Sequence, residues 1–267
     1  MRDGRRARPG PHRRHRDLFV SAVLVAGGAT GIGAAAVRAF RQRGDRVLLA
    51  DRNDEAGRAL IEEDLPGEGM FLHCDFSDGD AAEAAVEAAV GFGVGSLDVV
   101  FYNAAVLEAH PLGEWTVDDW DRSMAVNLRA PFLMSQAAAP HLRKSEQGRI
   151  ILTSSTGAFR GHAGMPAYHA TKAGLLGMVR ALADELGPDG VTVNAVCPGW
   201  VDTAFNDSFW AHQQDPGRAL GDLTESIPLR RQAAPDDMTG VLLFLASPAS
   251  SYITGQALVI DGGYTSV

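Results

Sequence analysis

The chain alternates short aliphatic segments with longer amphipathic ones along almost its whole length, and this alternation restricts the fold more than any other feature. Segments of the first kind are typical of buried strands, and the second kind have the apolar spacing of helices. The predicted strands cover residues 19–25, 46–51, 69–74, 97–102, 149–154, 191–197 and 257–260. The predicted helices cover residues 31–43, 54–64, 78–92, 117–143, 166–187 and 235–247. This order predicts an α/β fold with one doubly wound parallel sheet between two layers of helices.

Length and composition suit a single domain of this kind. The 267 residues are enough for one open α/β sheet, and 46% hydrophobic with 21% charged residues excludes a disordered or fibrous chain. No apolar run approaches the ~20 residues that a membrane span needs. The two cysteines, Cys74 and Cys197, give no disulfide framework and fit a reducing cytoplasm. The histidines lack metal-ligand spacing, so no metal site is expected.

Charge divides the chain into a tail and a body. Residues 1–17 hold seven Arg and two Asp and are therefore positively charged. The net charge of residues 18–267 is consequently more negative than the -9 of the whole chain. We predict a disordered basic tail over 1–17 and one domain over 18–267. Such an acidic body is not expected to bind nucleic acid. Arg13-Arg14 and the apolar residues 18–25 imitate an export signal, but the apolar run is short and leads into a glycine turn. We interpret it as the first strand.

A glycine turn lies between the first strand and the first helix. Gly27, Gly31 and Gly33 have the spacing that lets backbone approach a pyrophosphate at a helix N-terminus. Asp51 ends the second strand, where a carboxylate accepts hydrogen bonds from ribose hydroxyls and repels a 2′-phosphate. This favours NAD over NADP, although Arg52 beside it is able to meet that phosphate. A methyltransferase shares these features, so they do not name the cofactor.

Two later segments carry acid/base chemistry. Ser155 ends the fifth predicted strand, and Tyr168 and Lys172 stand four residues apart at the start of a helix. Residues at this spacing share a helix face. A tyrosine ionises near pH ~10, and a neighbouring ammonium favours the phenolate. Tyr168 beside Lys172 is thus suited to acid/base chemistry near neutral pH, although a Tyr-x-x-x-Lys spacing taken alone occurs in helices by chance.

Taken together, these segments resemble the classical short-chain dehydrogenase/reductase (SDR) family over residues 19–263. The further parts of the resemblance are Asp75, Asn103, Asn127, Cys197-Pro198-Gly199, Val201, Thr203 and the ending at Asp261-Gly-Gly. It implies a Rossmann-type fold and an NAD(P)-dependent oxidoreductase that interconverts a secondary alcohol and a ketone. It also implies a homotetramer or homodimer, packed through the helices over 117–143 and 166–187 and the last strand.

The resemblance assigns four catalytic roles. Tyr168 would exchange the proton with the substrate oxygen, and Ser155 would hydrogen-bond that oxygen. Lys172 would lower the pKa of Tyr168 and hold the nicotinamide ribose. Asn127 would anchor a water that links Lys172 to solvent. The alternative for Asn127 is a helix-kink or capping role.

The resemblance also implies a cofactor-binding set. Its members are Gly27, Thr30, Gly31, Ile32, Gly33, Asp51, Arg52, Asp75, Phe76, Asn103, Ala104, Tyr168, Lys172, Pro198, Gly199, Val201 and Thr203. The alternative for Asp75 is a simple turn former. Two departures from the family pattern are Ala26, where Thr is usual, and Tyr102 and Ala105, where Asn and Gly are usual. We therefore expect the first and fourth strand ends to pack through apolar contacts.

The substrate side is less determined. Residues 203–232 form the one irregular stretch, which we predict to be a lid over the substrate, and Phe205, Phe209 and Trp210 would cover it. His162, between Ser155 and Tyr168, would line the same pocket. The alternative is a static core or subunit contact. An NADPH-dependent 3-oxoacyl thioester reductase and a catalytically silent dinucleotide-binding regulator remain open as functions, and no motif identifies the substrate.

Overall fold

A computed structural model describes residues 20–267, so the tail predicted over 1–17 lies outside the described residues. Seven strands form one parallel sheet with the order β3-β2-β1-β4-β5-β6-β7. They are β1 Ala22–Ala26, β2 Arg46–Asp51, β3 Gly69–His73, β4 Val99–Tyr102, β5 Arg149–Thr153, β6 Thr192–Pro198 and β7 Ala257–Ile260. The predicted doubly wound parallel sheet is therefore confirmed.

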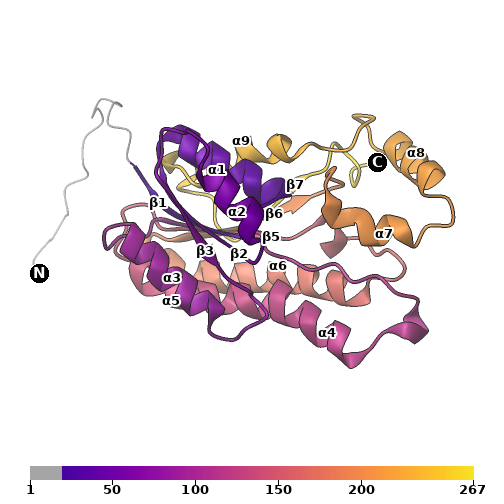
Figure 1. The fold of residues 1–267 in the computed structure, drawn as a ribbon, viewed down its shortest axis with the longest axis horizontal. Coiled ribbons are helices and arrows are strands. Elements are labelled where there is room, and N and C mark those ends of the chain that lie inside the picture. Colours follow the sequence, from indigo (N-terminus) through magenta and orange to yellow (C-terminus); the bar gives the residue numbers. More distant parts are fainter. Residues whose placement is uncertain (1–19) are drawn as a thin grey trace, which may run out of the picture.

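Helices cover both faces of the sheet. They are α1 Gly31–Arg43, α2 Asp54–Ile61, α3 Ala81–Phe92, α4 Val117–Met124, α5 Ala130–Leu142, α6 Pro166–Leu186, α7 Asp207–Ala211, α8 Pro216–Ser226 and α9 Thr239–Leu245. Figure 1 shows α3, α5 and α6 below the sheet and α1, α2 and α9 above it. The two helical layers and the sheet between them form the three-layer arrangement that the sequence predicts.

Strand β1 shows why the central strands read as continuous apolar runs. Leu24 and Ala26 belong to the core under α3, α5 and α6, whereas Val23 and Val25 belong to the core under α1 and α9. Successive side chains of a strand point to opposite faces. Because both faces are covered by helices, every position of the strand is buried and apolar.

The helix predicted over 117–143 is interrupted. A π-helical turn, Ala125–Arg129, separates α4 from α5, and the N–H of Ala130 donates to the carbonyl of Ala125. Pro131 follows at the start of α5 and has no N–H to donate to the carbonyl four residues earlier, which is that of Asn127. The missing donor allows the wider turn, and turns of this kind are frequent at functional sites.

The stretch over 203–232 is predicted from the sequence to be irregular. In the structure it contains the two helices α7 and α8. Helix α8 has standard start signals: the Asp215 carboxylate accepts from the N–H of Arg218 at 3.0 Å, and Pro216 opens the helix. Helix α8 has no buried residue, and it contains Gly217 and Gly221, which are poor helix formers and hide the helix in the sequence.

The order of the strands positions a site. Strands β1 and β4 are neighbours, and the chain moves outward from them in opposite directions. Loops that leave their carboxyl ends diverge and open a crevice at that edge of the sheet.

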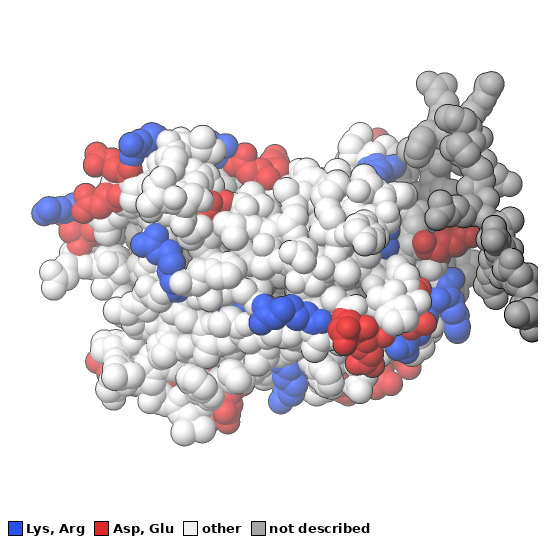
Figure 2. Space-filling model, turned by 180° about the vertical axis from the view of Figure 1, so that it is seen from behind, with Lys and Arg blue, Asp and Glu red and all other residues white. Residues whose placement is uncertain are grey.

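Other classes of site receive no support from the described residues. Residues 20–267 contain no group of three or more His, Cys, Asp and Glu arranged to hold a metal ion. In the same part of the chain, no helix combines the length and apolarity needed to cross a membrane. On the face seen in Figure 2, basic and acidic side chains are interspersed rather than gathered into a basic surface.

Candidate active site

One cavity of about 470 Å³ opens at the carboxyl edge of the sheet. All but one of the predicted cofactor-binding residues line it, and so do Ser155, His162 and Phe205. The exception is Gly33, which packs beneath the turn, where a Cβ would overlap the carbonyl of Gly27. Residues at the ends of the first six strands and in the loops that follow them thus meet in one place.

The glycine turn leaves an open cradle at the start of α1. Gly27 has a φ of 75°, and a Cβ there would overlap the backbone of Ala104. Thr30 precedes α1 in an extended conformation without a side-chain cap, and the first turn contains no acidic residue. The N–H groups of that turn therefore have no competing side-chain acceptor and suit an anionic group such as a pyrophosphate.

Carboxylates line the other end of the cradle. The N–H groups of Ala29 and Asn53 each donate to one oxygen of Asp51, both at 2.9 Å, and hold this carboxylate at the rim of the cavity. Arg52 lines the same end. The backbone N–H of Ser77 donates to Asp75 and is the largest cause that lowers the pKa of that carboxyl. These residues fit the adenosine half of a dinucleotide.

The first and fourth strand ends are joined both by apolar packing and by hydrogen bonds, since Ala26 and Tyr102 are paired and share one hydrophobic core. The N–H groups of Asn103 and Ala104 donate to the carbonyl of Ala26 at 2.8 and 2.9 Å. The Asn103 side chain donates to the carbonyl of Gly27 at 2.9 Å. Backbone donors and this amide connect the two segments without the usual threonine. The Tyr102 hydroxyl points elsewhere and donates to the carbonyl of Val126 in the π-helical turn at 2.7 Å.

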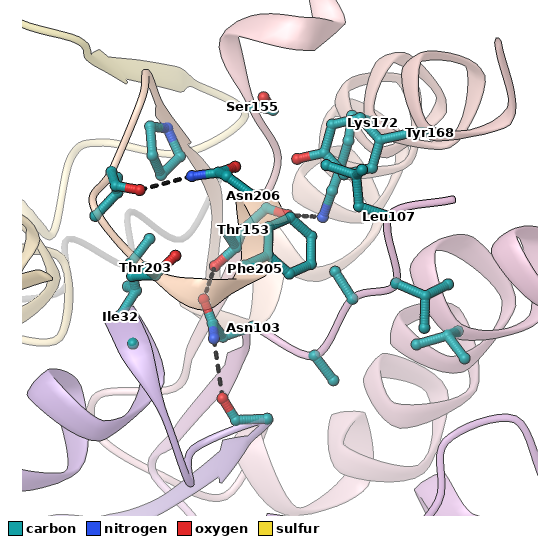
Figure 3. A pocket seen from close by; sticks show the side chains of 18 of the residues that line it. Ile32, Asn103, Leu107, Thr153, Ser155, Tyr168, Lys172, Thr203, Phe205 and Asn206 are labelled. Atoms are coloured by element: carbon teal, nitrogen blue, oxygen red, sulfur yellow. Dashed lines mark hydrogen bonds between the residues drawn. The ribbon is translucent and has the colours of Figure 1, made fainter. Parts of the chain in front are cut away.

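Tyr168 and Ser155 face each other in the cavity, with Lys172 one helical turn beyond (Figure 3). Burial raises the pKa of Tyr168 to about 12, although the hydrogen bond with Ser155 opposes the change. The phenol is therefore a proton donor that stays protonated at neutral pH. Its ring packs against Met165 and Ala109, so its position is set by the apolar wall as well as by Ser155.

Burial sets the direction of the Tyr168 pKa shift in this structure, and the expected lowering of that pKa by Lys172 stays a prediction. Its Nζ donates to the carbonyl of Thr153 at 2.8 Å and lies 5.6 Å from the centre of the Tyr168 ring. Burial lowers the pKa of the Lys172 ammonium to about 8. Removal of both groups from water is the larger effect, and it disfavours the charged form of each.

A chain of hydrogen bonds connects Lys172 with the glycine turn. The Thr153 carbonyl accepts from Lys172, and its hydroxyl donates to the Asn103 side chain at 3.1 Å. The Asn103 amide continues to Gly27, as Figure 3 shows. This chain of hydrogen bonds fixes the distance between Lys172 and the glycine turn. Thr153 was not among the predicted site residues.

The Asn127 side chain is occupied by structural hydrogen bonds. Its oxygen accepts from the N–H of Val106 at 2.8 Å, and its amide donates to the Val106 carbonyl at 2.9 Å. The amide also lies 3.3 Å from the Thr171 hydroxyl. Asn127 is buried and does not line the cavity. Its side chain clamps the loop after β4, which is neither the helix-kink nor the capping role, and the anchoring of a water by Asn127 stays a prediction.

The substrate half of the cavity is aromatic. Phe205 lies 6.1 Å from the Tyr168 ring, centre to centre, and extends over the opening in Figure 3. Phe209 and Trp210 do not line the cavity but pack behind Trp200, which does. Phe209 and Trp210, which the sequence predicted as substrate contacts, thus lie behind the wall of the cavity. Trp200 lines the cavity in their place. Trp200 directly follows the Pro198-Gly199 turn, a position that could have indicated it.

Known proteins are similar to this chain in sequence and in fold. The chain matches the family model described as enoyl-(acyl carrier protein) reductase over residues 27–265. The "Probable galactose dehydrogenase GalD" of Rhizobium meliloti (strain 1021) is 39% identical over 250 residues, which are 92% of this chain and 96% of that protein.

Solved structures agree in the fold. A short-chain dehydrogenase/reductase from Serratia marcescens BCRC 10948 superposes with a TM-score of 0.83 at 34% identity, over 91% of this chain and 97% of the other. A blue fluorescent protein from a metagenomic library, solved in complex with NADPH, gives a TM-score of 0.81 at 36% identity, over 91% and 96% of the two chains.

Proposed function

Because the chain belongs to the short-chain dehydrogenase/reductase family of oxidoreductases, we propose that it interconverts a secondary alcohol and a ketone with NAD(H). The meeting of Ser155, Tyr168 and Lys172 in one cavity with an open phosphate cradle carries this proposal. A bound nicotinamide supplies or accepts the hydride, and the protein provides orientation and proton transfer.

In the direction of ketone reduction, the neutral Tyr168 phenol donates its proton to the carbonyl oxygen as the carbon receives hydride. Ser155 donates a hydrogen bond to the same oxygen and holds it in place. Lys172 contributes a donor beside the ring and returns a proton to Tyr168 after turnover. Oxidation runs the same steps in reverse, with the alcohol proton passing to the phenolate.

A screen of secondary alcohols and ketones with both cofactors, followed at the nicotinamide absorbance, tests the proposal. It includes 3-oxoacyl thioesters with NADPH, which represent the alternative reductase. Turnover that depends on a ketone or alcohol supports an oxidoreductase. Tight dinucleotide binding without turnover of any compound would instead support the silent regulator.

We expect kcat/KM with NAD to exceed that with NADP at least tenfold, or roughly 1.4 kcal/mol of discrimination. The physical reason is the Asp51 carboxylate, which two backbone N–H groups hold at the rim where the ribose hydroxyls would lie. A 2′-phosphate there would meet a like charge. The measurement is steady-state kinetics with both cofactors at a fixed substrate.

The matched variants for this prediction are Asp51→Ala and Arg52→Ala. Asp51→Ala should narrow the gap between the cofactors, and Arg52→Ala should leave it or widen it. A wild-type preference for NADP that disappears in Arg52→Ala would show that the arginine, rather than the carboxylate, decides.

The segment over 203–232 is, in this proposal, a lid of the substrate pocket. Phe209 on α7 packs on Met165 and Leu107, and the Ser208 hydroxyl donates to the Leu107 carbonyl at 3.0 Å. Helix α8 buries no residue. Few buried apolar contacts are the mark of segments that open locally. Closure of α7 would exclude water from the site of hydride transfer.

Amide hydrogen exchange should show residues 207–226 weakly protected without ligand and protected with cofactor and substrate, while α3 remains unchanged as an internal control. Trp210→Ala should raise the KM for substrate more than the KM for NAD, because Trp210 stacks on Trp200 at 5.3 Å. Strong and equal protection in both states would identify a fixed wall.

Self-association and location are also proposals. Leu128, Phe132 and Met178 line a shallow hollow on the outer side of the helices α5 and α6, and Phe132 is exposed. This apolar surface supports the expected homotetramer or homodimer. Cys74 and Cys197 are buried and form no disulfide, which supports a reducing compartment such as the cytoplasm.

A further inference from the structure

His162 combines three features that the proposed catalytic machinery does not use. Its imidazole lines the cavity and is half-buried. Aromatic rings surround it, with that of Trp200 at 5.4 Å and that of Phe209 at 6.0 Å, centre to centre. Within residues 20–267, neither ring nitrogen has a hydrogen-bond partner, and only the backbone N–H is engaged. The ring therefore offers polar atoms inside an otherwise apolar wall.

The loop that carries His162 is held rigidly. The N–H of His162 donates to Nε2 of His169 at 2.8 Å, so this nitrogen is an acceptor. Nδ1 of His169 lies 2.8 Å from the Gly157 carbonyl and must be the donor. Both nitrogens of His169 thus serve the loop over 157–162. The guanidinium of Arg160 also stacks on the Tyr264 ring at 4.3 Å. Such anchoring orients the His162 ring before substrate arrives.

The charges of the cavity lie away from His162. Among the described residues that line it, Asp51, Arg52 and Asp75 belong to the adenosine end, and Lys172 belongs to the catalytic group. The described residues that line the substrate half include two histidines, His162 and His169, and no Asp, Glu, Arg or further Lys. Burial, with the nearby charge of Arg160, lowers the pKa of His162 below its ordinary value, so its ring is neutral at pH 7. An anionic substrate would find no fixed countercharge beside this wall.

We propose that His162 forms a second polar subsite, which selects uncharged cyclic ketones or alcohols that carry a further hydroxyl or carbonyl away from the reacting carbon. The aromatic wall at Trp200 and Phe205 contacts the apolar ring of such a substrate. The neutral imidazole, with one donor and one acceptor nitrogen, pairs with the second oxygen. This inference rests on the proposed oxidoreductase function and adds the substrate class to it.

The test compares ketones that differ by one distant oxygen. The pairs are cyclohexanone with 4-hydroxycyclohexanone and 2-tetralone with 6-hydroxy-2-tetralone, and 4-oxocyclohexane-1-carboxylate is the charged probe. For the wild type, kcat/KM should be at least tenfold higher for the hydroxylated member of one pair or both, and lowest for the carboxylate. In His162→Leu, that advantage should disappear, mainly through KM, while the plain ketones change less than about threefold.

Two further variants make the result specific. His162→Gln, which keeps a donor and an acceptor, should restore part of the advantage, and His141→Leu, on the last turn of α5, should behave as wild type. An equal loss for plain and hydroxylated ketones in His162→Leu would overturn the subsite. So would a wild type that prefers the carboxylate or shows no preference for the second oxygen.

Binding is measured separately from turnover. Quenching of tryptophan fluorescence by each ketone reports occupation of the wall at Trp200 without any hydride transfer. A hydroxyl-dependent increase in affinity that vanishes in His162→Leu, in a protein that reduces none of the compounds, would support the subsite and contradict the proposed function. Turnover of ketones that loses no preference for the second oxygen in His162→Leu would support the proposed function and contradict the subsite.

Discussion

Tyr168→Phe is expected to reduce kcat by about 10²–10⁴-fold, the usual range for loss of a general acid or base. The phenol is buried, faces Ser155 and has its pKa raised to about 12, so at neutral pH it is the proton donor of the cavity. Phenylalanine keeps the ring that packs on Met165 and Ala109. The KM for NAD should change little. Steady-state kinetics in both directions measure the effect.

Tyr252→Phe is the matched control, because this tyrosine is fully exposed and its hydroxyl touches no part of the site. It should behave as wild type. A Tyr168→Phe enzyme with near-normal kcat would mean that another group supplies the proton and that Tyr168 only supports the wall.

Lys172→Met is expected to reduce turnover about 10²-fold or more, since the proposed mechanism returns the proton to Tyr168 through this lysine. It is also expected to raise the melting temperature at pH 7. Lys172 is buried, and burial lowers the pKa of its ammonium from 10.5 to about 8. The folded protein therefore holds a charge that its surroundings disfavour. In a domain of this size, each kcal/mol relieved raises the melting temperature by roughly 2–4 °C.

The pH dependence of stability identifies the cause. Because the pKa of Lys172 is lower in the folded protein, the unfolded chain binds more protons between pH 8 and pH 10.5. The contribution of this residue to stability consequently rises with pH in that window and is least favourable below pH 8. The advantage of Lys172→Met should thus be largest at pH 7 and shrink towards pH 10.

Thermal unfolding of both proteins across this range measures the difference. Lys144→Met, which changes the other lysine of the sequence, an exposed one, is the control. A Lys172→Met protein that melts below wild type at pH 7 would show that the bond to Thr153 outweighs the cost of burial.

The sequence predicts the sheet and most helices because burial on both faces leaves a strong apolar signal. The bounds of α1 and β2 coincide with the predicted residues 31–43 and 46–51. The interruption at 125–129 was missed because the apolar pattern over 117–143 stays continuous across it, although Pro131 is a local signal of a break. Helix α8 was missed because Gly217 and Gly221 are poor helix formers and are typical of loops.

The site was predicted where short motifs carry the chemistry, as in the glycine turn and the Tyr168–Lys172 pair. Properties that depend on how deeply a side chain is buried in the folded protein were not predicted. The raised pKa of Tyr168 and the lowered pKa of Lys172 follow from burial, which spacing along a helix does not encode. The contact between Trp200 and His162 joins segments almost forty residues apart, and no local pattern announces it.

The uncapped first turn of α1 has a consequence for the life of the protein in a cell. A ligand whose phosphates accept from those N–H groups binds only the folded chain, so its binding free energy adds to the free energy of unfolding. At a free concentration 100 times the Kd, the gain is about 2.7 kcal/mol. Proteases degrade the unfolded fraction, which this gain reduces about a hundredfold. The abundance of the enzyme would then follow the supply of its own dinucleotide.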